Sequence, residues 1–230
     1  MGACILVGVG CDQDPQKYNE EEAKAQQQEL LERFPIPPPD TPEELREKEA
    51  IVEETLPKVY ELLEEAKTDP TKVDEVVKLS MSLLTLVPGH RAAKVAYGKA
   101  RLASFFVKEA IDENGQMIDQ HYMAIDIRSA CLEMDRLRNT YEDLSEDEVQ
   151  LCQEIYFNRA RLEGFYPHGE DAVEIFNDTI GKLMSLGFND VERLKTEPRF
   201  EYFFTDPKFA PVLQAAIEQM EASAEDDGAK

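Results

Sequence analysis

The chain has 230 residues, of which 42% are hydrophobic and 32% are charged, and its formal net charge is −23. This length is sufficient for one sizeable hydrophobic core. The acidity argues against binding to nucleic acid, and against docking on anionic lipid by charge alone, because both require a basic face. No apolar run reaches the roughly 20 residues that span a bilayer.

Residues 1–11 are apolar up to Cys11 and are followed at once by the polar Asp12. This pattern resembles the end of a bacterial lipoprotein signal peptide, with cleavage before Cys11 and lipidation of that cysteine. The resemblance implies a lipid-anchored protein of the bacterial cell envelope. A basic start is missing, and Gly8 stands where Leu is usual. The alternatives are an irregular N-terminus of a cytoplasmic protein and, with weaker support, myristoylation at Gly2.

Residues 12–40 are polar and end in a proline-rich stretch at 35–40. Prolines break regular structure and stiffen a chain. Leu30, Leu31 and Phe34 are the only short apolar group in this part of the segment. We therefore predict a tether that packs poorly on the rest of the protein.

Helical signals begin at Thr41 and continue to Leu186. Thr41 and Pro42 form a strong helix start. Pro57 is expected to kink or divide this first helix. Turn and breaker residues then delimit five more helices, which we place at about residues 70–87, 90–110, 117–141, 145–165 and 171–186. Ser145 and Glu148 have the spacing of a capping box. No sustained alternation of period two occurs, so the predicted fold is all-α.

Six helices with short turns form either a bundle or a stack of antiparallel helical hairpins. Tyr156, Ala160, Ala172 and Phe176 have the spacing of a tetratricopeptide repeat, and Pro88 closes a helix as the terminal proline of that family does. Over about residues 46–187 the chain resembles this family, which implies a tetratricopeptide-like α-solenoid. The repeats here are longer than the family's, and the middle pair of helices aligns poorly. A plain α-bundle remains the alternative.

The C-terminal part repeats an acid-Pro-base-Phe unit, at residues 197–200 and 206–209. A solenoid end exposes an apolar face that needs a cap. We predict a short helical cap over residues 188–220, with its apolar side chains supplied by Leu194, Phe200, Phe203, Phe204 and Phe209. An aromatic ligand pocket is the less favoured interpretation. Residues 221–230 are expected to be disordered.

The sequence offers little for catalysis. The three histidines are scattered, no nucleotide-binding or nucleophile motif is present, and none of the four cysteines forms a C-x-x-C pair. We therefore expect no enzyme activity, no cofactor and no metal. Cys131 and Cys152 fall at similar height on adjacent antiparallel helices, so they are expected to pack as small hydrophobes or, in an exported protein, to form a disulfide.

Residues 76–108 contain no Asp or Glu, which is unusual in so acidic a chain. Lys94, Arg101 and Lys108 are seven residues apart and share one stripe of a helix. In tetratricopeptide arrays the first helix of each pair lines a groove that clamps acidic peptides in several members. The resemblance thus implies a cationic groove for a protein or acidic peptide partner, lined by Arg91, Lys94, Arg101, Lys108 and Arg159. The competing interpretation is that these bases pair with acids of neighbouring helices.

Taken together, these patterns predict a non-enzymatic helical-repeat adaptor that is tethered to a membrane through a lipidated Cys11. A cytoplasmic adaptor of the same fold is the first alternative. An all-α enzyme with an unrecognised site is the second.

Overall fold

The computed structural model describes residues 39–109, 120–163 and 171–228. The chain divides into two compact units, Met1–Glu43 and Glu44–Lys230. Only residues 39–43 of the first unit are described, so the tether predicted at 12–40, with Leu30, Leu31 and Phe34, and the segment around Cys11 lie outside the described residues. The described part of the chain contains α-helices and 3₁₀ turns but no strand, which confirms the all-α prediction.

The first two helices are α2 (Pro42–Ala66) and α3 (Val73–Leu86), joined through the 3₁₀ turn η1 (Pro70–Lys72). Pro57 lies inside α2, which continues through it, so the helix is not divided. The physical reason is that Pro57 is on the exposed side, where water can satisfy the carbonyl that loses its partner. The Asp69 carboxylate accepts a bond from the Thr71 N–H and caps η1.

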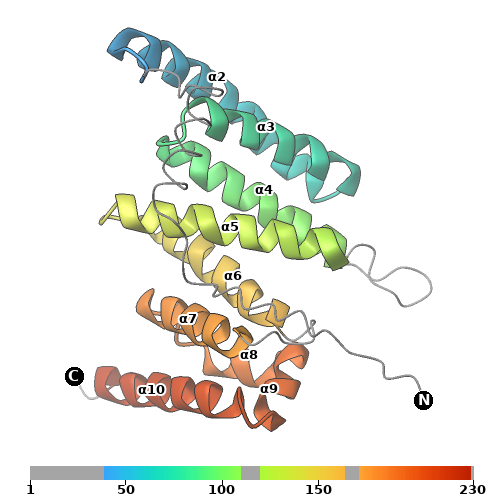
Figure 1. Ribbon diagram of the computed structural model, residues 1–230, viewed down its shortest axis with the longest axis vertical. Helices are drawn as coiled ribbons and strands as arrows, with labels where there is room; N and C mark the ends of the chain where they lie inside the picture. Colours follow the sequence, from blue (N-terminus) through green and yellow to red (C-terminus); the bar gives the residue numbers. More distant parts are fainter. Residues whose placement is uncertain (1–38, 110–119, 164–170, 229–230) are drawn as a thin grey trace, which may run out of the picture. The chain divides into compact units, whose positions relative to one another are not determined.

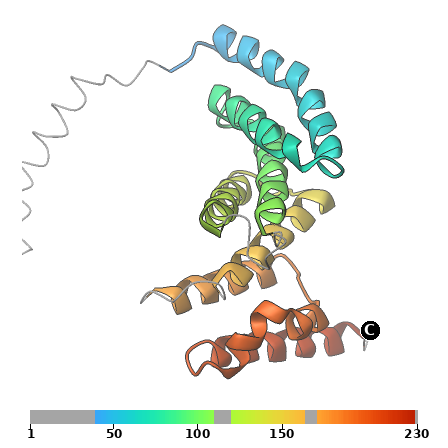
Figure 2. The same ribbon diagram turned by 90° about the vertical axis from the view of Figure 1, so that its right-hand side faces the viewer.

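Helices α4 (Arg91–Glu109), α5 (Gln120–Thr140) and α6 (Glu146–Glu163) form the centre of the second unit. Figure 1 shows the succession of helices from α2 to α10, and Figure 2 shows α5 lying against α4. Small residues allow this close approach: a Cβ on Gly98 would lie 2.8 Å from the Met134 Cε atom of α5. Helix α4 contacts α3, α5 and α6, so it is enclosed on several sides.

The start of α6 is the predicted capping box. The Ser145 Oγ atom accepts a bond from the Glu148 N–H at 3.3 Å, and the Glu148 carboxylate accepts one from the Ser145 N–H at 2.8 Å. The same carboxylate binds the Arg91 guanidinium of α4, with nitrogen–oxygen distances of 2.8 and 2.6 Å. The cap of α6 is therefore also a link between α6 and α4.

Glu148 is expected to make stability depend on pH. The Arg91 guanidinium, together with Ser145, lowers the pKa of Glu148 from 4.5 to about 2. A carboxyl with a lowered folded-state pKa stabilises the fold above its unfolded pKa, and this contribution is lost as the pH falls through about 2. Glu148→Gln should therefore lower the free energy of unfolding by about 1–3 kcal/mol at neutral pH. The difference from wild type should shrink on acidification.

Urea unfolding followed by circular dichroism at neutral and at low pH measures this difference. The control is Glu146→Gln, an exposed position in the same helical turn. It should stay close to wild type at both pH values. A Glu148→Gln deficit that is equally large at neutral pH and near pH 2 would show that the loss has another cause.

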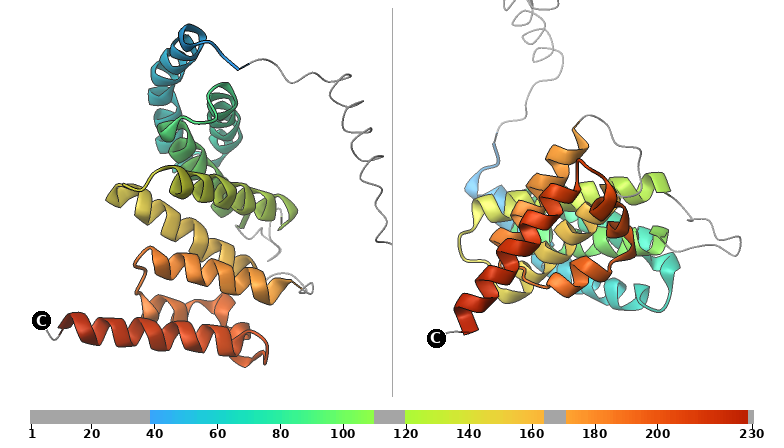
Figure 3. Two further views of the ribbon diagram at one scale, coloured as in Figure 1. Left: turned by 60° about the vertical axis from the view of Figure 1, so that its left-hand side comes forward. Right: turned by 90° about the horizontal axis from the view of Figure 1, so that it is seen from below.

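Helix α7 (Ala172–Ser185) ends in a Schellman motif, in which the Phe188 N–H donates to the Leu183 carbonyl and the Gly187 N–H to that of Met184. Gly187 has φ 76°, a left-handed conformation that favours glycine. The remaining elements are α8 (Val191–Thr196), η2 (Pro198–Phe200), α9 (Glu201–Thr205) and α10 (Ala210–Gly228), and α10 packs on α7 (Figure 3).

Two hydrophobic clusters hold these helices together. The smaller one joins α2, α3 and α4 through residues such as Val59, Val76 and Ala96. The larger one runs from α4 through α5, α6 and α7 to the C-terminal helices. Helix α4 contributes to both clusters, which explains why six consecutive residues from Ala93 to Gly98 are buried.

Phenylalanines form the core of the C-terminal part. Phe176 of α7 is fully buried, with ring centroids 4.5 Å from Phe203, 5.4 Å from Phe209 and 6.2 Å from Phe200. In both acid-Pro-base-Phe units the acid accepts backbone N–H bonds from the residues that follow, so each unit is a tight turn that directs its phenylalanine inward. The rings fill the space between α7 and the C-terminal helices.

Two sequence predictions fail in this region. Phe204, expected in the cap, is 36% exposed, because it follows Phe203 in a short helix and points to the other side. Residues 221–230 were expected to be disordered, but α10 continues to Gly228. The helix is anchored by buried Ile217 and Met220 and by an ion pair of Glu221 with Lys195 at 2.7 Å, and it extends past them.

Candidate functional site

The predicted basic stripe of α4 is turned toward α5. Lys94 is only 4% exposed, and its Nζ atom lies 3.4 Å from the Glu133 carboxylate, which is equally buried. Glu133 also pairs with Arg136, one turn along α5. A groove lined by Lys94, Arg101 and Lys108 requires these side chains to be exposed, but Lys94 is buried and the side chains of the other two are only 15% and 20% exposed. The reason is that the facing helix supplies buried acids at matching heights.

Arg101 and Lys108 converge on one buried carboxylate. Asp126 of α5 is 1% exposed, and each of its two oxygens lies 2.5 Å from one of the two bases. Ser104 donates a further hydrogen bond to Asp126 at 2.7 Å. The Arg101 Nε atom donates to the Tyr97 hydroxyl at 2.9 Å. This Asp126 cluster (Arg101, Ser104, Lys108 and Asp126) joins α4 to α5.

The two other predicted bases are also paired internally. Arg91 binds Glu148 and Asp143 and lies over the ring of Tyr141, at 4.8 Å from its centroid. Arg159 is buried against Glu163 on its own helix. All five residues predicted to line the cationic groove are thus placed in ion pairs within the protein. This arrangement matches the competing interpretation of the acid-free window, while a role in partner binding stays a prediction.

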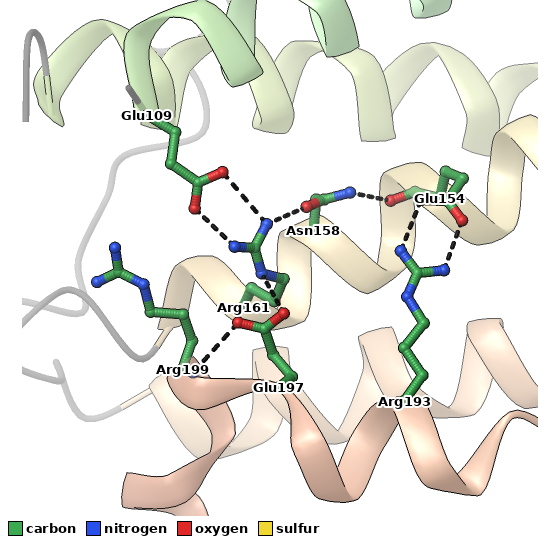
Figure 4. A network of polar contacts seen from close by, with 7 residues as sticks. All are labelled: Glu109, Glu154, Asn158, Arg161, Arg193, Glu197 and Arg199. Carbon is green, nitrogen blue, oxygen red and sulfur yellow. Dashed lines mark hydrogen bonds and ion pairs between the residues drawn. The ribbon is translucent and has the colours of Figure 1, made fainter. Parts of the chain in front are cut away.

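A second polar network fixes the C-terminal elements to α6. In Figure 4 the Arg161 guanidinium of α6 reaches Glu109 at the end of α4, at 2.7 Å, and Glu197 before η2, at 3.1 Å. Arg193 of α8 binds the Glu154 carboxylate with both Nη atoms, at 2.5 and 2.8 Å, and stacks on Phe157. These contacts tie three separate segments together, so we assign them a structural role.

Sequence reasoning missed an apolar cleft formed by α2, α3 and α4. It has a volume of about 510 Å³ and is lined mainly by apolar side chains, among them Tyr60, Leu63, Val73, Leu102, Phe106 and Val107. Phe106 is 45% exposed, although its neighbour Phe105 is fully buried. A large aromatic side chain exposed in an apolar cleft is typical of a binding surface.

One lysine stands out in this cleft. Lys99 lies over the ring of Tyr60, with its Nζ atom 5.6 Å from the ring centroid. Among the described residues it forms no ion pair, unlike Arg91, Lys94, Arg101 and Lys108 of the same helix. Burial raises the pKa of the Tyr60 hydroxyl, which keeps it neutral. The cleft therefore combines an apolar wall with Lys99, which pairs with no acid of the described chain, and with the Lys67–Glu64 ion pair, whose atoms are 2.7 Å apart.

Neither described cysteine is equipped for nucleophilic chemistry. Cys131 and Cys152 are both free thiols, so the disulfide that was the alternative for an exported protein is not formed. Burial raises the pKa of Cys131 to about 12 and that of Cys152 to about 11. Thiols with raised pKa values are protonated at neutral pH and unreactive. The expected packing as small hydrophobes is confirmed, because Cys152 belongs to the larger cluster and Cys131 packs against it.

The described part of the chain contains no group of three or more His, Cys, Asp or Glu side chains arranged to hold a metal ion. None of its helices has the length and apolarity to cross a bilayer. Comparisons with models of protein families, with curated proteins and with solved structures gave no match.

Proposed function

We propose that this protein is a non-enzymatic helical scaffold that binds a polypeptide partner. On this proposal its helices stack as hairpins in the manner of a tetratricopeptide array. The contacts of α4 with α5 and with α6, the first helix of the next pair, support this arrangement. In such a stack each unit contacts mainly its neighbours. Open clefts between successive helices then serve as binding surfaces.

The observation that carries the proposal is the cleft between α2, α3 and α4. Its apolar wall, exposed Phe106 and Lys99, which pairs with no acid in the described part of the chain, fit a peptide segment with a bulky apolar residue next to a carboxylate. The apolar side chain would contact Phe106 and Leu102, and the carboxylate would pair with Lys99. Two or three peptide side chains fill a cavity of this volume, about 510 Å³, whereas a whole domain does not enter it.

Affinity capture from an extract of the source cells tests this proposal. The wild-type chain should retain a polypeptide that is lost with Phe106→Asp and with Lys99→Glu. The matched control is Ile175→Asp, which changes another exposed apolar residue, on α7 (37% exposed, against 45% for Phe106), and should retain the polypeptide. Circular dichroism confirms that each variant is folded. If only small molecules are retained, or if the cleft variants capture as well as wild type, the proposal fails.

The apolar segment that ends at Cys11 supports a second, separate proposal, that the chain is tethered to a bacterial membrane by a lipid on this residue. Membrane fractionation of wild type and Cys11→Ser tests it. The lipid-anchored protein should sediment with membranes and the variant should not. Equal distribution of the two proteins would favour the cytoplasmic alternative.

A further inference from the structure

The outward face of α5 has an unusual composition for this chain. The exposed residues at Tyr122, Ile125, Arg128, Leu132, Arg136 and Asn139 recur every three or four positions. They form a single stripe, which we call the α5 stripe. It is about 25 Å long, at about 1.5 Å per residue. Tyr122 is 55% exposed, Ile125 40% and Leu132 52%.

All acids of α5 from Tyr122 onward are committed to contacts inside the unit. Asp126 binds Arg101 and Lys108, Glu133 binds Lys94 and Arg136, and Asp135 accepts bonds from Tyr156 and Lys182. As a result the exposed residues of the α5 stripe include arginine and apolar side chains but no acid. This is the opposite of what a net charge of −23 would give on average. Asp135 lies at the edge of the stripe with 31% of its side chain exposed, and it is paired with Lys182 at 2.9 Å.

The two arginines of the stripe remain accessible. Arg128 is exposed and forms no ion pair among the described residues. Arg136 touches the buried Glu133 but keeps 57% of its side chain exposed. Figure 2 shows α5 at the margin of the helical unit, where another chain can reach it. From Ile125 to Asn139 the stripe is therefore a basic and apolar surface that no described element covers. Tyr122, at its start, lies against Lys108 of α4, with 5.6 Å between the Nζ atom and the ring centroid.

We propose that the α5 stripe docks an acidic amphipathic helix of a partner polypeptide. Apolar residues of the partner would pack on Ile125 and Leu132, and flanking carboxylates would pair with Arg128 and Arg136. A straight stripe along one helix is the geometry that a second helix matches by interdigitating side chains. Local charge decides this contact, because salt screens the more distant acids beyond roughly 8 Å.

A lipid surface is the less favoured occupant. Docking on anionic lipid typically takes a cluster of four to eight basic residues, roughly 1 kcal/mol each. The stripe has two arginines in a chain with a charge of −23.

The proposal goes beyond the cleft, because it uses a different helix and different side chains. With both surfaces the protein can hold two polypeptide segments at once, which is what an adaptor requires.

Fluorescence anisotropy with two labelled synthetic peptides tests the proposal on the full-length protein. Both peptides are amphipathic helices about as long as α5 with a leucine face; one has glutamates beside the leucines and the other has lysines. The glutamate peptide should bind, and its affinity should fall at least about tenfold with Leu132→Asp or Arg128→Glu. Added salt should weaken the binding. The matched control Ile175→Asp should bind like wild type.

Three outcomes would overturn the proposal. The first is no binding of the glutamate peptide. The second is equal binding of the lysine peptide, which would show that the arginines do not select charge. The third is wild-type binding by the Leu132→Asp and Arg128→Glu variants. Phosphatidylcholine–phosphatidylglycerol vesicles form a further arm: if they bind the protein and the glutamate peptide does not, the stripe is a lipid surface instead. These outcomes do not depend on the cleft. If the affinity-capture experiment finds no polypeptide bound to the cleft, the peptide-binding test of the α5 stripe keeps its meaning.

Discussion

Asp126→Asn is expected to destabilise the protein by about 3 kcal/mol, because it leaves two partly buried cations without their carboxylate. The Arg101 and Lys108 side chains are only 15% and 20% exposed, so they cannot recover full hydration without leaving their positions. For a chain of this size the loss corresponds to a fall in Tm of roughly 6–12 °C. Thermal unfolding followed by circular dichroism measures it.

The matched control is Asp178→Asn. Asp178 is also paired with a base, Lys182, at 2.9 Å, but its side chain is 61% exposed. Exposed pairs contribute little, so this variant should change the stability by less than about 1 kcal/mol. Replacing Arg101, Lys108 and Asp126 together with apolar residues of similar size should recover much of the stability. If Asp126→Asn is as mild as Asp178→Asn, the cluster is more hydrated than its burial indicates.

The helices could be predicted because their signals are local. The capping box at Ser145 acts within one turn, and the structure has it as expected. The left-handed Gly187 that ends α7 is an equally local signal. The apolar spacing of Val52, Val59 and Leu62 likewise marks the buried face of α2 without knowledge of the rest. Leu45 and Ile51 belong to the same apolar series, but they are 38% and 50% exposed. Predicted helix ends therefore lie within a few residues of the observed ones.

The fate of the basic residues was not predictable in the same way. Lys94 and Glu133 are 39 positions apart, and Arg101 and Asp126 are 25 apart. Only the pairing of α4 with α5 brings these charges together. The absence of acids from residues 76–108 indicates an unneutralised positive charge when this segment is considered alone. In the structure, acids of the facing helix α5 neutralise the charges of Lys94, Arg101 and Lys108. The cleft at Phe106 was missed for a related reason: two adjacent phenylalanines point to opposite environments, and the sequence does not say which is buried.

The charge on the exposed face of α5 depends on where each residue lies around the helix axis, and not only on the composition of the helix. Over residues 122–139, Asp126 and Glu133 lie on the side facing α4, and the arginines at 128 and 136 lie on the exposed side. Asp135 lies at the edge between these sides, where it is held by Tyr156 of α6 and by Lys182. Composition alone reports a mixture of charges. The internal pairing of Asp126 and Glu133 with bases of α4 therefore has two consequences: it stabilises the contact between the helices, and it leaves the outer face of α5 basic.

Phe176→Ala is expected to destabilise the protein by about 3–5 kcal/mol, because it opens a cavity at the centre of the phenylalanine group. Phe176 contacts Phe200, Phe203 and Phe209, which come from three successive C-terminal segments, so its loss removes the common surface on which they dock. Urea unfolding should give a lower midpoint. Hydrogen exchange should show the largest gain in α8, α9 and α10.

Phe204→Ala removes a side chain of the same type from the same region, but one that is 36% exposed. It should cost less than about 1.5 kcal/mol, because less apolar surface is withdrawn from water at this position. Comparing the stability losses of Phe176→Ala and Phe204→Ala therefore separates the effect of burial from the effect of residue type. Equal losses for the two variants would contradict the packing seen here. Rapid exchange throughout α2 to α7 in Phe176→Ala would show that the C-terminal helices and the other helices unfold together, as one cooperative unit and not as a body with a separable cap.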